Sequence, residues 1–172
     1  MTVDDGLRPI FRQHLPQLMW TSIETGGTGL GVPDSHYLAP ARLACPQCRD
    51  LKESMRMCYC AISAGAEGMI EYKRTDGWAV DLRPEQVAYL TRRARLGGRA
   101  FVGVRRRHAG GPRRGPPVDA LHLFPGSLAR EALAGGLRCP ALQVPAHHVW
   151  PGGPSRWPWT EVLAALLAQP SR

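Results

Sequence analysis

Three charged residues in two separate segments have the types and spacing needed for metal-assisted hydrolysis of a phosphodiester. Asp34 follows a Gly-Val-Pro turn, whereas Glu71 and Lys73 flank Tyr72 in a segment with strand character. Residues two positions apart in a strand point to the same face, so Glu71 and Lys73 would project together, away from Ile70 and Tyr72. If Asp34 lies on a neighbouring strand, two carboxylates and an ammonium group meet in one cluster.

Such a cluster predicts a specific chemistry. Two hard oxygen ligands, here Asp34 and Glu71, can hold Mg²⁺ or Mn²⁺ while the ion keeps most of its waters. A lysine beside the metal, here Lys73, can orient a water or neutralise charge that develops on a phosphate. The alternative is a structural salt bridge on a sheet, and because triplets of this kind also occur by chance, the rest of the chain must support the catalytic interpretation.

The composition favours a polyanionic partner. The chain has 172 residues, a net charge of +8 and a sequence pI of about 9.8, with basic residues that are mostly arginine. A chain of this length suits a single domain. Arginine forks bind phosphate bidentately, and a basic domain of this size favours nucleic acid, so DNA is the expected partner. A basic surface that reflects only biased composition is the alternative.

No membrane segment or disulfide framework is expected. No run of residues approaches the ~20 apolar positions of a membrane span. Residues 1–9 contain acids and no hydrophobic core of a signal peptide, so we expect a soluble, cytoplasmic protein. The five cysteines are an odd number, and a reducing compartment makes paired disulfides improbable.

Sequence patterns in the first half predict a helix and several strands. Residues 7–20 carry an apolar stripe of helical period, which Pro16 would kink or break. Strands are predicted at residues 22–25, 34–39 and 68–73, with a returning strand at 78–82. The glycine-rich residues 26–31 lack the Gly-Lys-Ser/Thr ending of a P-loop, so they either let the backbone approach a ligand closely or form a tight turn.

The clearest helix covers residues 83–96, with Pro84 in its first turn and Gly97-Gly98 at its end. Beyond it we predict a strand at 100–104, a basic loop at 105–117, a strand at 120–124, a helix at 127–134 with Ser127 as N-cap, irregular chain at 135–157 and a closing helix at 159–168. Helices that alternate with strands favour an α/β fold, in which helices flank a mixed central β-sheet.

These segments together resemble the PD-(D/E)XK nuclease superfamily, and within it the archaeal-type Holliday junction resolvases, the virus-type replication and repair nucleases and small phage-encoded relatives. The resemblance rests on Glu24, Gly-Leu-Gly-Val-Pro-Asp34, Ile-Glu71-Tyr-Lys73, Arg-Pro-Glu-Gln86-Val and Gly-Gly-Arg-Ala-Phe-Val102. It implies a restriction-endonuclease-like core, dependence on Mg²⁺ or Mn²⁺, and DNA cleavage in recombination or repair. A resolvase that cuts two strands in symmetry would be a homodimer.

The resemblance also implies roles for individual residues. Asp34 and Glu71 match the metal-binding acids, and Lys73 matches the lysine that positions the attacking water or stabilises the pentavalent phosphate. Glu24 matches an earlier acid of resolvase-like members, and Gln86 matches a polar residue on the following helix that often faces the site. The chain departs from the pattern at the middle position of Glu-Tyr-Lys, which is commonly smaller, and in the long segment between the two acids.

Basic residues on and after the predicted helix are the candidates for phosphate contacts, which set affinity and make it salt-dependent. They are Arg92, Arg93, Arg99, Arg105, Arg106, Arg107, Arg113 and Arg114. Branched DNA is the substrate favoured by the resemblance. The alternatives are a nuclease of the same fold that acts on ends or nicks, and a zinc-stabilised nucleic-acid-binding module without catalysis.

The long segment at residues 40–65 is predicted to be an insertion in a single nuclease domain, which residues 135–172 extend at the C-terminal end. The insertion contains the pairs Cys45/Cys48 and Cys58/Cys60, whose spacing could complete a tetrahedral zinc site of four thiolates. His36 or Cys139 could replace one ligand. The alternative is four ordinary thiols in a loop, and a structural zinc is favoured over a catalytic one.

Overall fold

The computed structural model describes residues 6–23, 31–40 and 65–168, and these form a mixed α/β fold around one sheet. The sheet has six strands in the order β1 to β6. They are β1 (Met19–Ser22), β2 (Ser35–Ala39), β3 (Ala66–Thr75), β4 (Arg99–His108), β5 (Val118–Pro125) and β6 (His148–Pro151). Neighbouring strands are antiparallel except β3 and β4, which are parallel.

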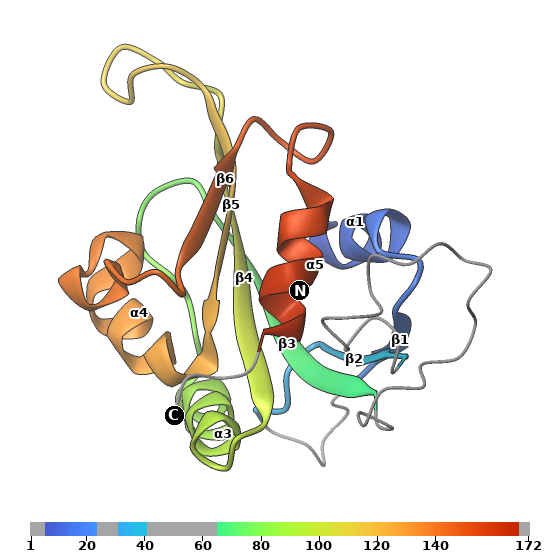
Figure 1. The fold of residues 1–172 in the computed structure, drawn as a ribbon. Coiled ribbons are helices and arrows are strands. Elements are labelled where there is room, and N and C mark those ends of the chain that lie inside the picture. The colour runs from blue at the N-terminus through green and yellow to red at the C-terminus, as the bar shows by residue number, and fades with distance from the viewer. Residues whose placement is uncertain (1–5, 24–30, 41–64, 169–172) are drawn as a thin grey trace.

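Helices cover both faces of the sheet (Figure 1). They are α1 (Leu7–His14), α3 (Pro84–Arg95), α4 (Ala129–Gly135) and α5 (Trp159–Leu167), with short 3-10 turns at Gly126–Leu128, Gly136–Arg138 and Pro140–Leu142. Helix α3 provides the crossover that a parallel strand pair requires. In Figure 1, α1 and α5 lie on one side of the sheet and α3 and α4 on the other, and the β4–β5 hairpin projects beyond both layers.

Each face of the sheet has its own apolar core, because successive strand residues point to opposite faces. Ile70 and Tyr72 of β3 pack with α1 and α5, as predicted, on what we call the α1–α5 face. Val102 and Val104 of β4 pack with α3 and α4 on the α3–α4 face. Glu71, which lies between Ile70 and Tyr72, therefore points toward the α3–α4 face.

The predicted mixed α/β sheet flanked by helices is confirmed. The helix predicted at 83–96, the strands at 34–39, 68–73, 100–104 and 120–124, and the closing helix all form, with bounds that differ by a few residues. In α3, Val87 and Leu90 are buried. Gly97 follows the helix with a φ of 79°, a conformation that suits a helix end.

The prediction of one helix over residues 7–20 is wrong in its second half. Helix α1 ends at His14, two residues before Pro16, and the chain turns into β1 at Met19. Met19 pairs with Leu38 of β2, so the backbone groups beyond the turn bond across the sheet. Of the strand predicted at 22–25, Ser22 belongs to β1, Ile23 follows the strand, and residues 24 and 25 lie outside the described ranges.

Two predictions around the β3–β4 region are also wrong. Residues 78–82 form no strand; instead Val80 and Leu82 are buried in the core of the α3–α4 face. The basic segment predicted as a loop at 105–117 begins as regular strand, because β4 continues to His108, which pairs with Val118 of β5. Only residues 109–117 lie outside the two strands.

The C-terminal third contains more regular structure than predicted. Trp150 pairs with Leu121, so β6 forms the edge of the sheet within residues expected to be irregular. Ser127 is not an N-cap: it lies inside a 3-10 turn, and the N-cap of α4 is Leu128, without a side-chain cap bond. None of the helices in the described ranges combines the length and apolar character that crossing a membrane would require.

Candidate functional site

Asp34 lies at the entrance to β2, and Gly31, three residues before it, lies against the start of α3. Gly31 has a φ of 86°, which L side chains rarely adopt, and a Cβ at this position would collide with the backbone carbonyl of Glu85. Glycine is thus required at position 31 for the backbone to lie against the first turn of α3. Whether the glycines of residues 26–31 serve a close approach to a ligand or a tight turn stays a prediction, because residues 26–30 lie outside the described ranges.

Asp34 is bonded directly to β3. Its Oδ2 accepts a hydrogen bond of 2.9 Å from the backbone N–H of Tyr72, and its Oδ1 lies 3.4 Å from Nη2 of Arg8 on α1. The side chain is partly exposed. The structure thus brings the Asp34 segment next to the segment of Glu71 and Lys73, because Asp34 is held beside the residue that follows Glu71.

Glu71 is the centre of the cluster. Its side chain is 1% exposed, and its Oε1 accepts hydrogen bonds from Nζ of Lys73, at 2.9 Å, and from Nε2 of Gln86 on α3. Gln86 is also buried, and its Oε1 accepts the backbone N–H of Arg83 at 3.0 Å, which leaves the amide nitrogen to face Glu71. Helix α3 thus fixes Oε1 of Glu71 through the Gln86 side chain.

Burial and a second carboxylate make the Glu71 side chain costly to ionise, a cost that a bound cation would offset. Burial and the nearby Asp34 carboxylate raise the pKa of Glu71 to about 7, although Lys73 acts in the opposite direction. The second oxygen of Glu71, Oε2, is buried and has no hydrogen-bond partner among the described residues. A buried acceptor without a partner costs free energy, so this atom is suited to a ligand.

The donor set fits Mg²⁺ better than a closed all-protein metal site. Asp34 and Glu71 are two hard oxygen donors, and the described ranges contain no group of three or more His, Cys, Asp or Glu side chains suited to a metal. Mg²⁺ is commonly held by one or two carboxylates together with waters and substrate phosphate oxygens. The unpartnered Oε2 of Glu71 is the atom most suited to such an ion.

Other predicted ligands lie elsewhere or outside the described residues. Glu24 and the four cysteines Cys45, Cys48, Cys58 and Cys60 fall outside the described ranges. His36 is hydrogen-bonded to Glu67, with 3.3 Å between Nε2 and Oε2. Cys139 is a free thiol packed against the core of the α3–α4 face.

The arginines predicted to contact DNA do not form one surface. Arg92, Arg93 and Arg99 lie near the end of α3 and the start of β4, and Arg93 pairs with Glu67 at 2.8 Å. Arg105 is buried, and its guanidinium group forms two hydrogen bonds with Asp119.

The remaining predicted arginines lie at or near the β4–β5 hairpin. Arg107, Arg113 and Arg114 are exposed, whereas Arg106 packs on the indole ring of Trp78.

The sequence analysis did not identify three residues that make these contacts. Arg8 reaches Asp34 from α1, and Trp78 and Arg138 pack against each other from segments far apart in the chain. No local pattern distinguishes them from other surface arginines or core tryptophans.

No protein-family model matches the chain, and no match was found among curated proteins or solved structures. The interpretation of the site therefore depends on its own residues.

Proposed function

We propose that the protein is a metal-dependent DNA endonuclease with a restriction-endonuclease-like core, resembling the Holliday junction resolvases. One observation carries the proposal: the buried Glu71 carboxylate contacts Lys73 and Gln86, lies next to Asp34, and has one oxygen that no described residue partners. A purely structural ion pair between Glu71 and Lys73 would not account for a buried carboxylate oxygen that no described residue partners.

Each residue of the cluster would have a separate role in hydrolysis. Asp34 and Glu71 would hold the divalent ion, which when bound supplies a Lewis acid for the phosphate and a more acidic water. Lys73 would place a positive charge where negative charge develops on the phosphate oxygens. Gln86 holds Glu71 in the orientation in which its second oxygen remains available, and it therefore acts as a positioning residue.

The choice of DNA as substrate depends on charge and on the resemblance. The net charge of +8 favours a polyanion, and the exposed arginines of the hairpin offer phosphate contacts outside the cluster. Branched DNA and a homodimer are part of the proposal because the motifs resemble those of junction resolvases.

A cleavage assay with matched glutamate variants tests this function. Four-way junction, linear duplex and single-stranded DNA are incubated with the protein, with Mg²⁺ or with EDTA. Glu71→Gln is compared with Glu67→Gln, since Glu67 lies on the same strand and the same face but outside the cluster. We expect Glu71→Gln to lower the cleavage rate at least about a hundredfold and Glu67→Gln to change it only a few-fold.

The choice of substrate in the assay separates junction cleavage from cleavage of ends. Preferential cleavage of the four-way junction supports the resolvase-like function, whereas preference for linear ends points to a different nuclease of this kind. Full Mg²⁺-dependent activity of Glu71→Gln, or DNA binding without cleavage of any substrate, would contradict the proposal.

A further inference from the structure

Trp78 lies between two arginines from distant parts of the chain. The guanidinium carbon of Arg106 lies 3.7 Å from the centre of the indole ring, and that of Arg138 lies 3.8 Å from it. Two planar groups cannot occupy the same space over one ring, so they cover opposite faces of the indole. The attraction of cations to the ring thus holds two like charges on opposite sides of a single indole.

Neither guanidinium group has a neutralising carboxylate within residues 6–23, 31–40 and 65–168. In the described residues, no carboxylate forms an ion pair with Arg106 or with Arg138. Burial and the neighbouring Arg138 lower the pKa of Arg106, which is the direction expected for a cation without a counter-charge. An anion that reached both groups at the edge of the indole would relieve their repulsion.

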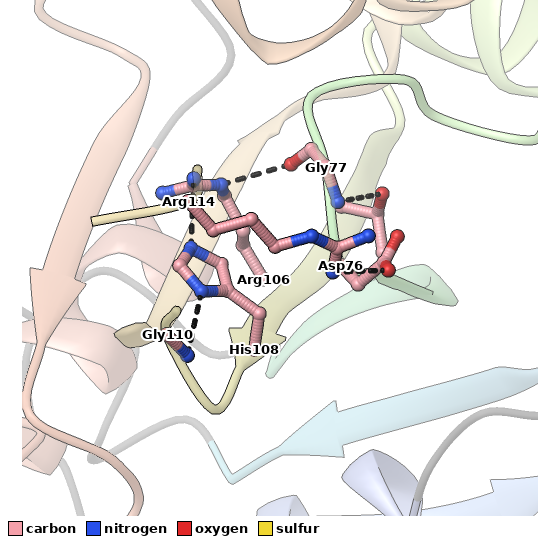
Figure 2. A network of polar contacts seen from close by, with 7 residues as sticks. Asp76, Gly77, Arg106, His108, Gly110 and Arg114 are labelled. Carbon is pink, nitrogen blue, oxygen red and sulfur yellow. Dashed lines mark hydrogen bonds and ion pairs between the residues drawn. The ribbon is translucent and has the colours of Figure 1, made fainter. Parts of the chain in front are cut away.

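The surroundings form a basic depression of about 400 Å³, lined mainly by arginine side chains and by His108. Its one carboxylate, Asp76, is paired with Arg114 at 2.7 Å, and this pair joins the hairpin to the bend after β3 (Figure 2). In the same view Arg106 donates to the carbonyl of Gly77, at 2.8 Å between Nε and O. The depression therefore has an ordered wall and an excess of positive charge.

Arg106 also retains donor capacity. Its Nη2 lies 3.2 Å from Nε2 of His108, and the N–H of Gly110 lies 3.2 Å from Nδ1 of the same ring (Figure 2). A neutral imidazole has only one acceptor nitrogen, so His108 can accept from one of these donors at a time. When Gly110 is the donor, Nη2 of Arg106 is left to bind another acceptor.

We propose that Arg106 and Arg138, held by Trp78, bind a backbone phosphate of a nucleic-acid strand outside the cleavage cluster. Planar guanidinium forks suit bidentate phosphate contacts. Both faces of the indole are covered, so no base can stack on it, and the site would recognise only the phosphate charge. Binding is accordingly expected to be independent of base sequence.

The position of the site suits a strand that also reaches the cluster. Arg106 pairs with Thr75 in the parallel register, two residues beyond Lys73, and shares the α3–α4 face with Glu71. The four residue-to-residue steps from Glu71 to Thr75 span about 13 Å along β3. A DNA strand covers this length in about four nucleotides. The choice of nucleic acid as the ligand rests on the proposed function. The ability of the two arginines to bind phosphate does not rest on it.

The test measures DNA binding as a function of salt, with EDTA present to prevent cleavage. Labelled single-stranded and duplex DNA are titrated with the wild type, Arg138→Gln and Arg130→Gln at several KCl concentrations. Arg130 is an exposed arginine on the nearby α4 and serves as the matched control. Arg138→Gln should weaken binding several-fold and reduce the slope of log K against log[salt] by about 1, whereas Arg130→Gln should match the wild type.

Two further variants keep the test decisive. Arg138→Lys restores the charge and should recover most of the salt slope, which a purely structural role for the arginine would not predict. If Arg138→Gln fails to fold, as judged by its thermal transition, Arg113→Gln removes another arginine of the depression from the exposed hairpin and should reduce the slope in the same way.

The outcomes separate this site from the proposed function. Equal salt slopes for Arg138→Gln and Arg130→Gln would overturn the site even if Glu71-dependent cleavage were observed. A reduced slope without cleavage of any substrate would keep the site and overturn the nuclease. If inorganic phosphate bound at the site and Arg138→Gln abolished only that binding, the ligand would be a small phosphate compound and the inference would be wrong.

Discussion

The backbone N–H of Tyr72 donates a hydrogen bond to the carboxylate of Asp34 at 2.9 Å, and this bond joins two segments 38 positions apart in the chain. The ladder between β2 and β3 ends where Ser35 pairs with Ile70, so no β2 residue is opposite Tyr72. The Asp34 side chain replaces the missing strand partner. The buried Tyr72 ring anchors this part of β3, which fixes Asp34 relative to the adjacent Glu71.

This bond predicts different stabilities for two substitutions of Asp34. Asp34→Ala leaves the Tyr72 N–H without its acceptor and should lower the free energy of unfolding by about 1–3 kcal/mol. Asp34→Asn keeps an acceptor oxygen and should cost less, although both variants lose the ion pair with Arg8. Urea unfolding in EDTA measures the difference, and equal stabilities of the two variants would show that the bond contributes nothing.

A buried histidine pair predicts a loss of stability in acid. Nδ1 of His147 lies 3.0 Å from the carbonyl of Leu142, which can only accept, so Nε2 of His147 must accept from Nδ1 of His122 at 3.1 Å. Burial and the neighbouring His147 lower the pKa of His122 to about 4. Its folded pKa thus lies below the unfolded value, so the unfolded chain takes up the proton first as the pH falls.

The stability that neutral His122 contributes is therefore present above about pH 6.5 and is lost between about pH 6.5 and 4. The raised pKa of Glu71 acts with the opposite sign over a similar range, so the comparison must be made against a variant. The stability of the wild type relative to His122→Asn should fall by about 2–4 kcal/mol from pH 7.5 to pH 4. Parallel stability curves for the two proteins would contradict the assignment.

Gly68 is predicted to tolerate no side chain. A Cβ at Gly68 would overlap the ring and hydroxyl of Tyr37, which is fully buried and donates a hydrogen bond of 2.6 Å to the carbonyl of Leu166 on α5. Gly68→Ala should destabilise the protein by about 1–3 kcal/mol, because the ring must shift away from α5. Chemical denaturation measures this cost, and Gly77→Ala is the control, since a Cβ there meets no atom within 4 Å.

A double-mutant cycle shows whether the collision with Tyr37 causes the loss. Tyr37→Phe removes the bond to Leu166, so in that background the ring can move with less penalty. The two substitutions together should cost less than the sum of the single ones. Additive costs would mean that Gly68 is constrained by something other than Tyr37.

Much of the local structure followed from the sequence, because short-range rules decide it. The alternation of Ile70, Glu71, Tyr72 and Lys73 assigned each side chain to the correct face of β3, since a strand has a period of two residues. Proline at the start and glycine at the end delimited α3 to within a residue or two. The helix of residues 7–20 failed because the choice between helix and strand after Pro16 depended on a partner strand that follows later in the chain.

The sequence by itself determined the types of residue available for chemistry and the face of the strand on which Glu71 and Lys73 lie. The resemblance implied that Gln86 faces the site, but only the tertiary structure decided that its amide contacts Glu71. The same holds for the pairing of Arg105 with Asp119 and for the packing of Arg138 on Trp78. These contacts join segments distant in the chain, so they depend on sheet register and helix packing. Local propensity carries no information about either.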